Sequence, residues 1–448
     1  MSKTKTYYQC KTCKYNSIKW LGCCPECNNW QTFQELKDSN LLLSKSKKKQ
    51  PVSLVKLNSI KNIVKQRMLS GFSEWDRVVG NGIMPSSLLV LTGDPGIGKS
   101  TLLLQISSNL AKNYTVFYFS SEESLHQVKN RAQRLKCDNN NLLFSDQANL
   151  ESIIETTKKQ KPDLLIIDSI QNCYTKEGKT IPGSISQLRE SAFLLMRLAK
   201  ENDIATIVSG HITKDGNIAG PKTLEHMVDG VFYLQGEDKW QTRVLRSVKN
   251  RFGTINELGF FQMSQNGLQE MPNINQHLIE QISHSPGSVL ISFIEGSRPL
   301  LIELQALTIA SKLGIPQRVI SGIDHKQVVL IAAILEKYLR VKLSSNDIFF
   351  KVSGGFKIKS SSTDLGIALA LLSSYFQQPL PKKSIALGEI SLTGHIKPIN
   401  QINVHIKEAS KFGIQQILVS KNQDLEKNNC EVKKFENVYE LLTLFDHD

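Results

Sequence analysis

The stretch LLVLTGDPGIGKST, residues 88–101, decides the fold that we expect for this chain. An apolar run ends at Gly93, and Gly93-x-x-x-x-Gly98-Lys99-Ser100 has the spacing of a phosphate-binding loop. This motif requires a buried strand before it and a helix after it. Residues 88–91 are apolar enough for the strand, and residues 102–106 begin a helical pattern. The sequence therefore predicts nucleotide binding rather than a purely structural glycine turn.

The residue types in this loop suit ATP and Mg²⁺. Glycines let the backbone curl so that its N–H groups face phosphate oxygens, and the positive end of the next helix adds to the attraction. We expect Lys99 to reach the β- and γ-phosphates and the Ser100 hydroxyl to ligate Mg²⁺. The predicted nucleotide-binding residues are Gly93, Asp94, Pro95, Gly96, Ile97, Gly98, Lys99, Ser100 and Thr101.

The bulk composition limits the class of protein. A chain of 448 residues predicts two or three domains. The net charge of +14 favours a polyanionic partner such as nucleic acid, although a generally basic proteome gives the same balance. The sequence has no apolar run of about 18 residues or more, and its first residues lack the apolar core of a secretory signal. We therefore expect no membrane span and a cytoplasmic location.

Four cysteines near the start have the spacing of a zinc site. Cys10-x-x-Cys13 and Cys24-x-x-Cys27 are separated by ten residues, and four thiolates suit tetrahedral Zn²⁺ in a structural site. The adjacent Cys23 could compete as a ligand, and a redox pair is the alternative. The sequence predicts a compact zinc finger. The tryptophans that flank the second pair are expected to pack in its core, namely Trp20 and Trp30.

Composition and periodicity predict four parts of the chain. These are a zinc finger over 1–36, a linker over 37–58, an α/β ATPase domain over 59–272 and a second α/β domain over 273–448. The linker is polar and rich in lysine, with Lys45, Lys47, Lys48, Lys49 and Pro51. In the last domain we expect a helix from about Thr363, a hairpin over 388–394 and a final strand over 414–419.

Two further strands of the ATPase domain are predicted to end in carboxylates. The strand 164–167 is followed by Asp168, which we expect to support the Mg²⁺ ion, although a helix cap is the alternative. The strand 116–119 is followed by Ser121, Glu122 and Glu123. We expect Glu122 to orient the attacking water, and Glu123 is the competing candidate.

Three other polar segments are candidates for function. Gln127, Arg131 and Arg134 share one helix face, which could meet DNA, a neighbouring subunit or solvent. In the glycine-rich loop 210–221, His211 could sense the γ-phosphate or be structural. In the turn Lys249-Asn250-Arg251-Phe252-Gly253, two cations flank an amide, and a solvated turn is the alternative to a functional one.

Taken together, these motifs resemble bacterial RadA, also called Sms, a family of DNA-repair ATPases. The resemblance covers nearly the whole chain. It rests on the four-cysteine finger, GDPGIGKST, YFSSEES at 118–124, LLIIDSIQ at 164–171, GHITKDGNIAGPKTLEHMVD at 210–229 and KNRFG at 249–253. The resemblance implies a RecA-like core, assembly as a hexameric ring, and binding of single-stranded and branched DNA during recombination beside a RecA-type recombinase.

The C-terminal part is similar to the proteolytic domain of Lon, but the catalytic dyad is missing. Aligning the motifs puts Asp364 at the expected serine and Asn403 at the expected lysine. A shifted register could in principle use Lys407 with one of the serines at 360–362. We therefore expect a non-proteolytic platform, with lysines available for duplex DNA at Lys351, Lys357, Lys359, Lys382 and Lys383.

The function that this sequence predicts is a DNA-dependent ATPase of recombinational repair that processes branched intermediates as a ring-shaped motor. The alternatives are a Lon-type ATP-dependent protease, a nucleotide-switched scaffold and a recombinase-like signalling ATPase. We expect Lys249 and Arg251 to couple ATP to DNA binding across a subunit interface. The predicted catalytic residues are Lys99, Glu122, Asp168, Lys249 and Arg251, and the cofactors are ATP, Mg²⁺ and Zn²⁺.

Overall fold

The computed structural model describes residues 6–37, 54–59, 66–175, 182–211, 224–236, 242–280, 282–312 and 315–445. The chain forms two compact units, Met1–Val64 and Lys65–Asp448. The lysine-rich part of the expected linker, with Lys45 to Pro51, lies outside the described residues. The division between the units falls a few residues after the predicted linker end at 58. The boundaries at 36, 58 and 272 stay predictions.

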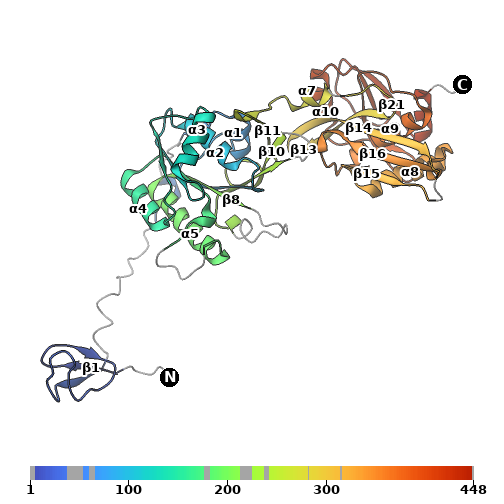
Figure 1. Cartoon of the computed structure of the whole chain (residues 1–448). Helices are drawn as coiled ribbons and strands as arrows, with labels where there is room; N and C mark the ends of the chain where they lie inside the picture. The colour runs from blue at the N-terminus through green and yellow to red at the C-terminus, as the bar shows by residue number, and fades with distance from the viewer. Residues whose placement is uncertain are drawn as a thin grey trace. The chain divides into compact units, whose positions relative to one another are not determined.

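The first unit contains a small antiparallel sheet (Figure 1). Its described strands are β1 (Thr6–Cys10), β2 (Asn16–Ser17) and β3 (Phe33–Lys37), in the order β2-β1-β3. Cys10, Cys24 and Phe33 are its buried apolar residues. The expectation that Trp20 and Trp30 pack in this core is wrong, because their side chains are 57% and 76% exposed. A core of this size has no room for two indole rings.

In the second unit, nine described strands form one sheet in the order β12-β11-β10-β9-β4-β8-β7-β5-β6. The strands from β4 to β8 run parallel, β9 joins them in parallel, and β10 to β12 continue as an antiparallel meander. Their bounds are β4 (Leu88–Gly93), β5 (Val116–Ser120), β6 (Leu142–Ser145), β7 (Leu164–Asp168), β8 (Ala205–His211), β9 (Gly230–Gly236), β10 (Thr242–Asn250), β11 (Leu258–Ser264) and β12 (Gly267–Glu270).

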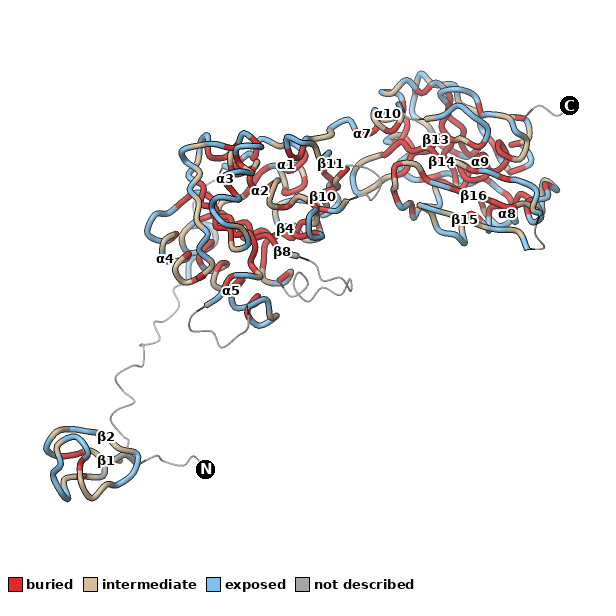
Figure 2. Tube along the Cα trace, viewed as in Figure 1, coloured by how far each residue is buried: buried red, intermediate tan, exposed pale blue. Residues whose placement is uncertain are grey.

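Helices cover both faces of this sheet. They are α1 (Ser73–Val79), α2 (Lys99–Leu110), α3 (Leu125–Arg134), α4 (Leu150–Gln160) and α5 (Ile185–Asn202). Successive side chains of a strand point to opposite faces, so a strand covered on both faces is buried throughout, and residues 88–91 of β4 are all apolar. Leu89 and Leu91 pack with α1, α2 and α3, whereas Leu88 and Val90 pack with α4 and α5. Figure 2 shows this buried sheet between exposed helix faces.

A second sheet fills the C-terminal part, with seven described strands in the order β15-β16-β14-β13-β17-β20-β21. They are β13 (Ser288–Glu295), β14 (Arg298–Ala310), β15 (Arg318–Ser321), β16 (Asn346–Val352), β17 (Ser384–Leu387), β20 (Gln416–Ser420) and β21 (Glu431–Phe435). The hairpin predicted at 388–394 is formed by β18 (Glu389–Ile390) and β19 (Ile396–Lys397). The strand predicted over 414–419 is β20, but it is not the last, because β21 pairs with it in parallel.

Helices also cover both faces of the second sheet, which places it in the α/β class. They are α7 (Ile274–Ile279), α8 (His325–Leu339), α9 (Asp364–Phe376) and α10 (Ile402–Lys411). Ile291 of β13 packs in the core with α8 and α9, and its neighbour Leu290 packs in the core with α10. Helix α9 is buried over its first three turns, which accounts for its apolar sequence. Among the described residues, no helix has the length and apolar character needed to cross a membrane.

The tip of the β13–β14 hairpin contacts the first sheet. Glu295 pairs with Arg246 of β10, and Arg298 Nη1 lies 2.8 Å from a carboxylate oxygen of Glu74 in α1. Glu74 is fully buried, and the Phe260 backbone N–H also donates to it at 2.8 Å. A buried carboxylate requires such partners because desolvating a charge is costly. The two sheets of the second unit are therefore tied by a buried ion pair.

Candidate nucleotide and zinc sites

The phosphate loop links β4 to α2 at the carboxyl end of the parallel strands. Gly93 ends β4, and a Cβ atom there would lie 2.2 Å from the Leu234 carbonyl oxygen of the neighbouring strand. Gly98 has a φ of +112°, and a Cβ atom there would lie 2.6 Å from Met263 Cε. Only glycine fits both positions. The helix begins at Lys99, so its free N–H groups face the concave side of the loop.

Lys99 lies at the mouth of this loop. Its ammonium group donates to the carbonyl oxygens of Gly93 at 2.9 Å and Asp94 at 3.0 Å, and its side chain is buried. Burial lowers the pKa of Lys99, while the nearby carboxylates of Asp168 and Glu122 act to raise it. These groups converge on one point of the sheet edge. A cation next to a curled loop and two carboxylates is an arrangement that fits a Mg²⁺–nucleotide complex.

Asp168 is held by two hydroxyl groups from neighbouring strands. The Tyr118 hydroxyl of β5 donates to Oδ2 at 2.7 Å, and the Ser209 hydroxyl of β8 donates to Oδ1. Burial and the Asp168 charge raise the pKa of Tyr118 well above its ordinary value, so the phenol remains a donor. Each carboxylate oxygen therefore has one fixed donor. Such donors orient a carboxylate that supports a metal ion.

The two glutamates after β5 have different surroundings. Glu122 accepts a hydrogen bond from the Ser169 hydroxyl, and its charge is among those that raise the pKa of Lys99. Glu123 forms an ion pair with Arg131 of α3. An ion-paired carboxylate is less able to accept a proton or orient a water molecule. The surroundings favour Glu122 for that role, which stays a prediction.

The other residues of the predicted helix face also have partners within the chain. Gln127 forms a capping box with Ser124 at the start of α3, and Arg134 Nη1 donates to the Gln265 carbonyl at 3.1 Å. With Arg131 paired to Glu123, this favours a structural role over DNA contact. The side chain of His211 and most of the loop 210–221 lie outside the described residues.

The KNRFG turn at the end of β10 is anchored near the start of β9. The Lys249 ammonium donates to the Glu225 carbonyl, and Arg251 pairs with Asp229 at 3.2 Å. Burial and the charge of Arg251 lower the pKa of Lys249. Asp229 is buried and also pairs with Lys200 at 3.0 Å, whereas the Arg251 side chain is 57% exposed. These contacts anchor the turn, while the side chain of Arg251 remains partly exposed to solvent.

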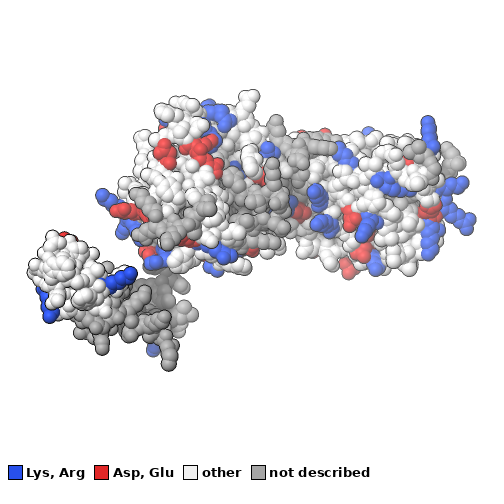
Figure 3. Space-filling view, turned by 60° about the horizontal axis from the view of Figure 1, so that its bottom comes forward, with Lys and Arg blue, Asp and Glu red and all other residues white. Residues whose placement is uncertain are grey.

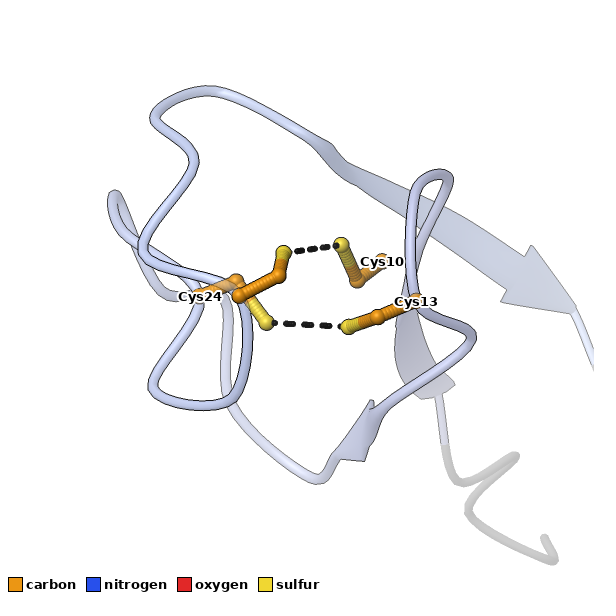
Figure 4. A group of neighbouring side chains, drawn as sticks. Cys10, Cys13 and Cys24 are labelled. Atoms are coloured by element: carbon orange, nitrogen blue, oxygen red, sulfur yellow. Dashed lines mark hydrogen bonds between the residues drawn. The ribbon is translucent and has the colours of Figure 1, made fainter.

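The zinc site is brought together as the spacing predicts. One ligand atom from each of Cys10, Cys13, Cys24 and Cys27 lies within 4.8 Å of the others. Two pairs of sulfurs are in contact, Cys10–Cys27 at 3.7 Å and Cys13–Cys24 at 3.4 Å. Figure 4 shows the side chains of Cys10, Cys13 and Cys24 gathered around one point. Tetrahedral Zn²⁺ with Zn–S bonds of about 2.3 Å separates its sulfurs by roughly 3.8 Å. The four thiols fit that geometry.

Hydrogen bonding favours the thiolate form of Cys10, and the geometry of the cluster leaves out Cys23. Hydrogen bonding to Thr32, whose Oγ1 lies 3.2 Å from the sulfur of Cys10, lowers the pKa of Cys10 to about 5. Cys23 lies beside the cluster but is not part of it, and its sulfur contacts the Cys24 carbonyl at 3.9 Å. Cys23 is therefore not a fifth candidate for the ion.

The C-terminal domain places the residues of the missing protease dyad in structural roles. Asp364 is buried at the start of α9, and it accepts hydrogen bonds from Gln327 Nε2 at 2.7 Å and the Ile390 N–H at 3.2 Å. Burial raises the pKa of Asp364 to about 6. Asn403 accepts a hydrogen bond from the Glu426 N–H at 3.3 Å. Asp364 and Asn403 therefore cannot act together as a nucleophile and its base.

The alternative alignment, which pairs Lys407 with one of the serines at 360–362, gives no catalytic dyad either. The hydroxyls of Ser360 and Ser362 lie 2.7 Å apart, and Ser361 donates to Glu389 at 3.0 Å. Among the contacts of the described residues, none joins these serines to Lys407, which is exposed on α10. The sequence did not point to the pair formed by Ser292 and His405 at 2.7 Å, which is too buried to meet a substrate.

Comparisons with protein families match three stretches of the chain. Residues 8–35 match the rubredoxin metal binding domain, residues 64–217 match an AAA domain, and residues 313–423 match subunit ChlI of Mg-chelatase. Among solved structures, the RadB recombinase aligns with 46% of this chain and 99% of its own, at 21% identity and a TM-score of 0.37.

Three curated relatives are similar over almost their whole length, and each is a DNA repair protein RadA. Identity is 42% to the protein of Streptococcus pyogenes serotype M6, covering 94% of both chains. It is 38% to that of Aquifex aeolicus, covering 99% of both, and 40% to that of Listeria monocytogenes, covering 94% of this chain and 93% of the relative.

Fold, site and comparisons define a P-loop ATPase with a RecA-like core, an N-terminal zinc ribbon and a C-terminal domain of the ChlI or Lon-like type. It hydrolyses ATP, and its cofactors are ATP, Mg²⁺ and Zn²⁺. The chain belongs to the RadA family of DNA repair proteins.

Sequence patterns did not identify the hydroxyls that hold Asp168, and the structure makes Tyr118 a testable positioning residue. Tyr118→Phe removes one donor from a buried carboxylate and leaves the ring in place. We expect the Mg²⁺ concentration for half-maximal ATPase activity to rise roughly tenfold, because a hydrogen bond to a charged group contributes about 1.5 kcal/mol or more. Nucleotide affinity measured without Mg²⁺ should not change.

The matched control for this substitution is Tyr114→Phe, which removes a hydroxyl between α2 and β5. Its Mg²⁺ dependence should equal that of the unmodified protein. If Tyr118→Phe only lowers the melting temperature and leaves the Mg²⁺ dependence unchanged, Tyr118 has no positioning role.

Proposed function

We propose that this protein is a DNA-stimulated ATPase that processes branched recombination intermediates in the cytoplasm as a ring-shaped motor, together with a RecA-type recombinase. Membership of the RadA family supports the repair role. The observation that carries the motor role is the distance between the phosphate loop and the KNRFG turn within one chain. This separation is what a site shared between subunits requires.

The strand register places the phosphate loop and the KNRFG turn at different levels of the sheet. Lys249 pairs with Val231 of β9, and Val231 is level with Val90 of β4. The loop begins at Gly93, three residues further along β4, which is roughly 10 Å at about 3.3 Å per residue. Strand β9 also lies between β10 and β4. The turn therefore faces away from the phosphate loop of its own chain.

A cation that cannot reach its own loop can stabilise charge in the site of a neighbouring subunit. We infer that Lys249 and Arg251 do so in the ring and respond to DNA. Within each site, Lys99 contacts the β- and γ-phosphates, Ser100 and Asp168 hold Mg²⁺, and Glu122 orients the attacking water. The surroundings of Lys99, Asp168 and Glu122 support these roles.

The test compares ATP hydrolysis with single-stranded DNA, duplex DNA and no DNA. We expect Lys249→Ala to retain nucleotide binding and the basal rate but to lose DNA stimulation. Lys159→Ala, which removes an equal charge from the exposed end of α4, should behave like the unmodified protein. If Lys249→Ala is stimulated normally, the turn does not couple the two sites.

The same assay separates the alternatives. A nucleotide-switched scaffold should turn over negligibly with or without DNA. A Lon-type protease should degrade unfolded casein in the presence of ATP. The positions of Asp364 and Asn403 support the absence of that second activity.

A further inference from the structure

The antiparallel strands β9 to β12 lie directly against the phosphate loop. A Cβ atom at Gly98 would lie 2.6 Å from Met263 Cε of β11. Ile97 faces the same strands, because a Cβ atom at Gly236 of β9 would lie 2.6 Å from Ile97 Cδ1. The loop is therefore supported by strands that contribute no residue to the phosphate-binding motif.

Arg243 of β10 is the cation in this contact. Its Nε–H donates to the Ile97 carbonyl oxygen at 3.2 Å, and its Nη1 donates to the Thr242 carbonyl oxygen at 3.1 Å. The direct partner of Arg243 on β9 is Gly236, which has no side chain to block the way to the loop. A Cβ atom at Gly236 would lie 3.4 Å from Nη1 of Arg243. The half-buried guanidinium is thus held by two carbonyl groups, one of which belongs to the phosphate loop.

The contact acts on one peptide group of the loop, the one between Ile97 and Gly98. In a trans peptide the C=O and N–H point in opposite directions, so the carbonyl directed at Arg243 turns the Gly98 N–H away from it. Gly98 is the N-cap of α2, where backbone N–H groups are available to anions. Arg243 therefore contacts one side of a peptide whose other side offers a donor to a phosphate.

A cation bonded to a carbonyl oxygen makes the N–H of the same peptide a stronger donor. The charge-assisted bond draws electron density toward the oxygen and leaves the N–H more positive. The bond also fixes the loop before a nucleotide binds, so less ordering is required on binding. Both effects favour binding of phosphate groups, and neither requires contact between Arg243 and the nucleotide.

We propose that Arg243 is a positioning residue of the nucleotide site and raises its affinity for nucleoside di- and triphosphates through the Ile97–Gly98 peptide. Arg243 follows Ile97 by 146 positions, so it lies outside the phosphate-loop motif. The proposal rests on the proposed placement of ATP at this loop. The ligand class follows from the donor, because a polarised backbone N–H at a helix start binds phosphate oxygens.

The test measures the affinity of the full chain for ADP by isothermal titration calorimetry. Arg243→Met keeps a long side chain without hydrogen-bond donors, and it should weaken ADP binding about tenfold, corresponding to about 1.4 kcal/mol. The KM for ATP should rise by a similar factor while kcat stays within about twofold, because this change removes binding common to the ground and transition states.

Two conservative variants separate charge from geometry. In Arg243→Gln, the amide nitrogen stands at the position of Nε along the side chain, so a neutral donor remains. Arg243→Lys keeps a charged donor. The affinity for ADP should increase in the order methionine, glutamine, lysine, arginine at this position. A merely structural role predicts instead a lower melting temperature and a lower kcat in Arg243→Met, with no recovery in Arg243→Lys.

Arg197→Met is the matched control, because it removes an exposed guanidinium from α5. Figure 3 shows lysines and arginines at many points of the visible surface, so the loss of one exposed cation changes the surface charge only slightly. This variant should bind ADP as the unmodified protein does.

Three results would overturn the role of Arg243. These are an unchanged ADP affinity in Arg243→Met, an equal loss in Arg197→Met, and a loss that Arg243→Lys does not reduce. Lys99→Ala, assayed in parallel for turnover, distinguishes this outcome from a failure of the proposed site. Unchanged turnover in Lys99→Ala would place the nucleotide elsewhere and overturn both. Lost turnover there, with normal ADP affinity in Arg243→Met, would overturn the role of Arg243 alone.

Discussion

Lys99→Ala is expected to lower the rate of ATP hydrolysis by about 10²–10³-fold, with or without DNA. The reason is electrostatic, because Lys99 is the buried cation at the mouth of the phosphate loop and its ammonium is already held by two loop carbonyls. Phosphoryl transfer depends mainly on positioning and charge stabilisation, so loss of this cation cannot be replaced by solvent. A coupled assay of phosphate release measures the effect.

Two controls separate chemistry from folding. Alanine has the highest helix propensity, so the first turn of α2 should remain intact in Lys99→Ala, and the melting temperature should change little. Lys112→Ala removes an exposed lysine just after the same helix and should leave the rate unchanged. An unchanged rate in Lys99→Ala would show that the ATP site lies elsewhere.

Cys24→Ser is expected to unfold the zinc ribbon and leave the second unit folded. The ribbon buries few apolar groups apart from Phe33 and its own ligands, so Zn²⁺ supplies most of its folding free energy. Zinc content should fall to background. Tryptic cleavage at the exposed residues Lys11, Lys14 and Lys19 should accelerate roughly a hundredfold, because cleavage follows the population of the open form.

The chain provides a matched control in the adjacent residue. Cys23→Ser makes the same chemical change one position earlier, at a sulfur outside the cluster. It should keep its zinc and its resistance to trypsin. Basal ATPase activity should be retained in both variants, since the ribbon belongs to the separate unit Met1–Val64. Loss of zinc from Cys23→Ser to the same extent would show that the ligand assignment is wrong.

The sequence alone determined the features that depend on local spacing. The motif from Gly93 to Ser100 runs from the end of a buried strand into the first turn of a helix, as such a motif requires. The four cysteines converge because two short knuckles fix their geometry. Apolar runs predicted the parallel strands, since a strand covered on both faces has no polar side. The position of Asp168 at the end of β7 follows from the same pattern.

The tertiary structure decided the features that depend on which distant residues meet. Tyr118 and Ser209 hold Asp168 only because β5 and β8 both pair with β7. The register of β9 and β10 places Lys249 away from the phosphate loop, and the motif KNRFG gives no indication of this. Strand pairing and side-chain partners form between segments far apart in the chain, and their energies depend on register and burial, which local spacing does not specify.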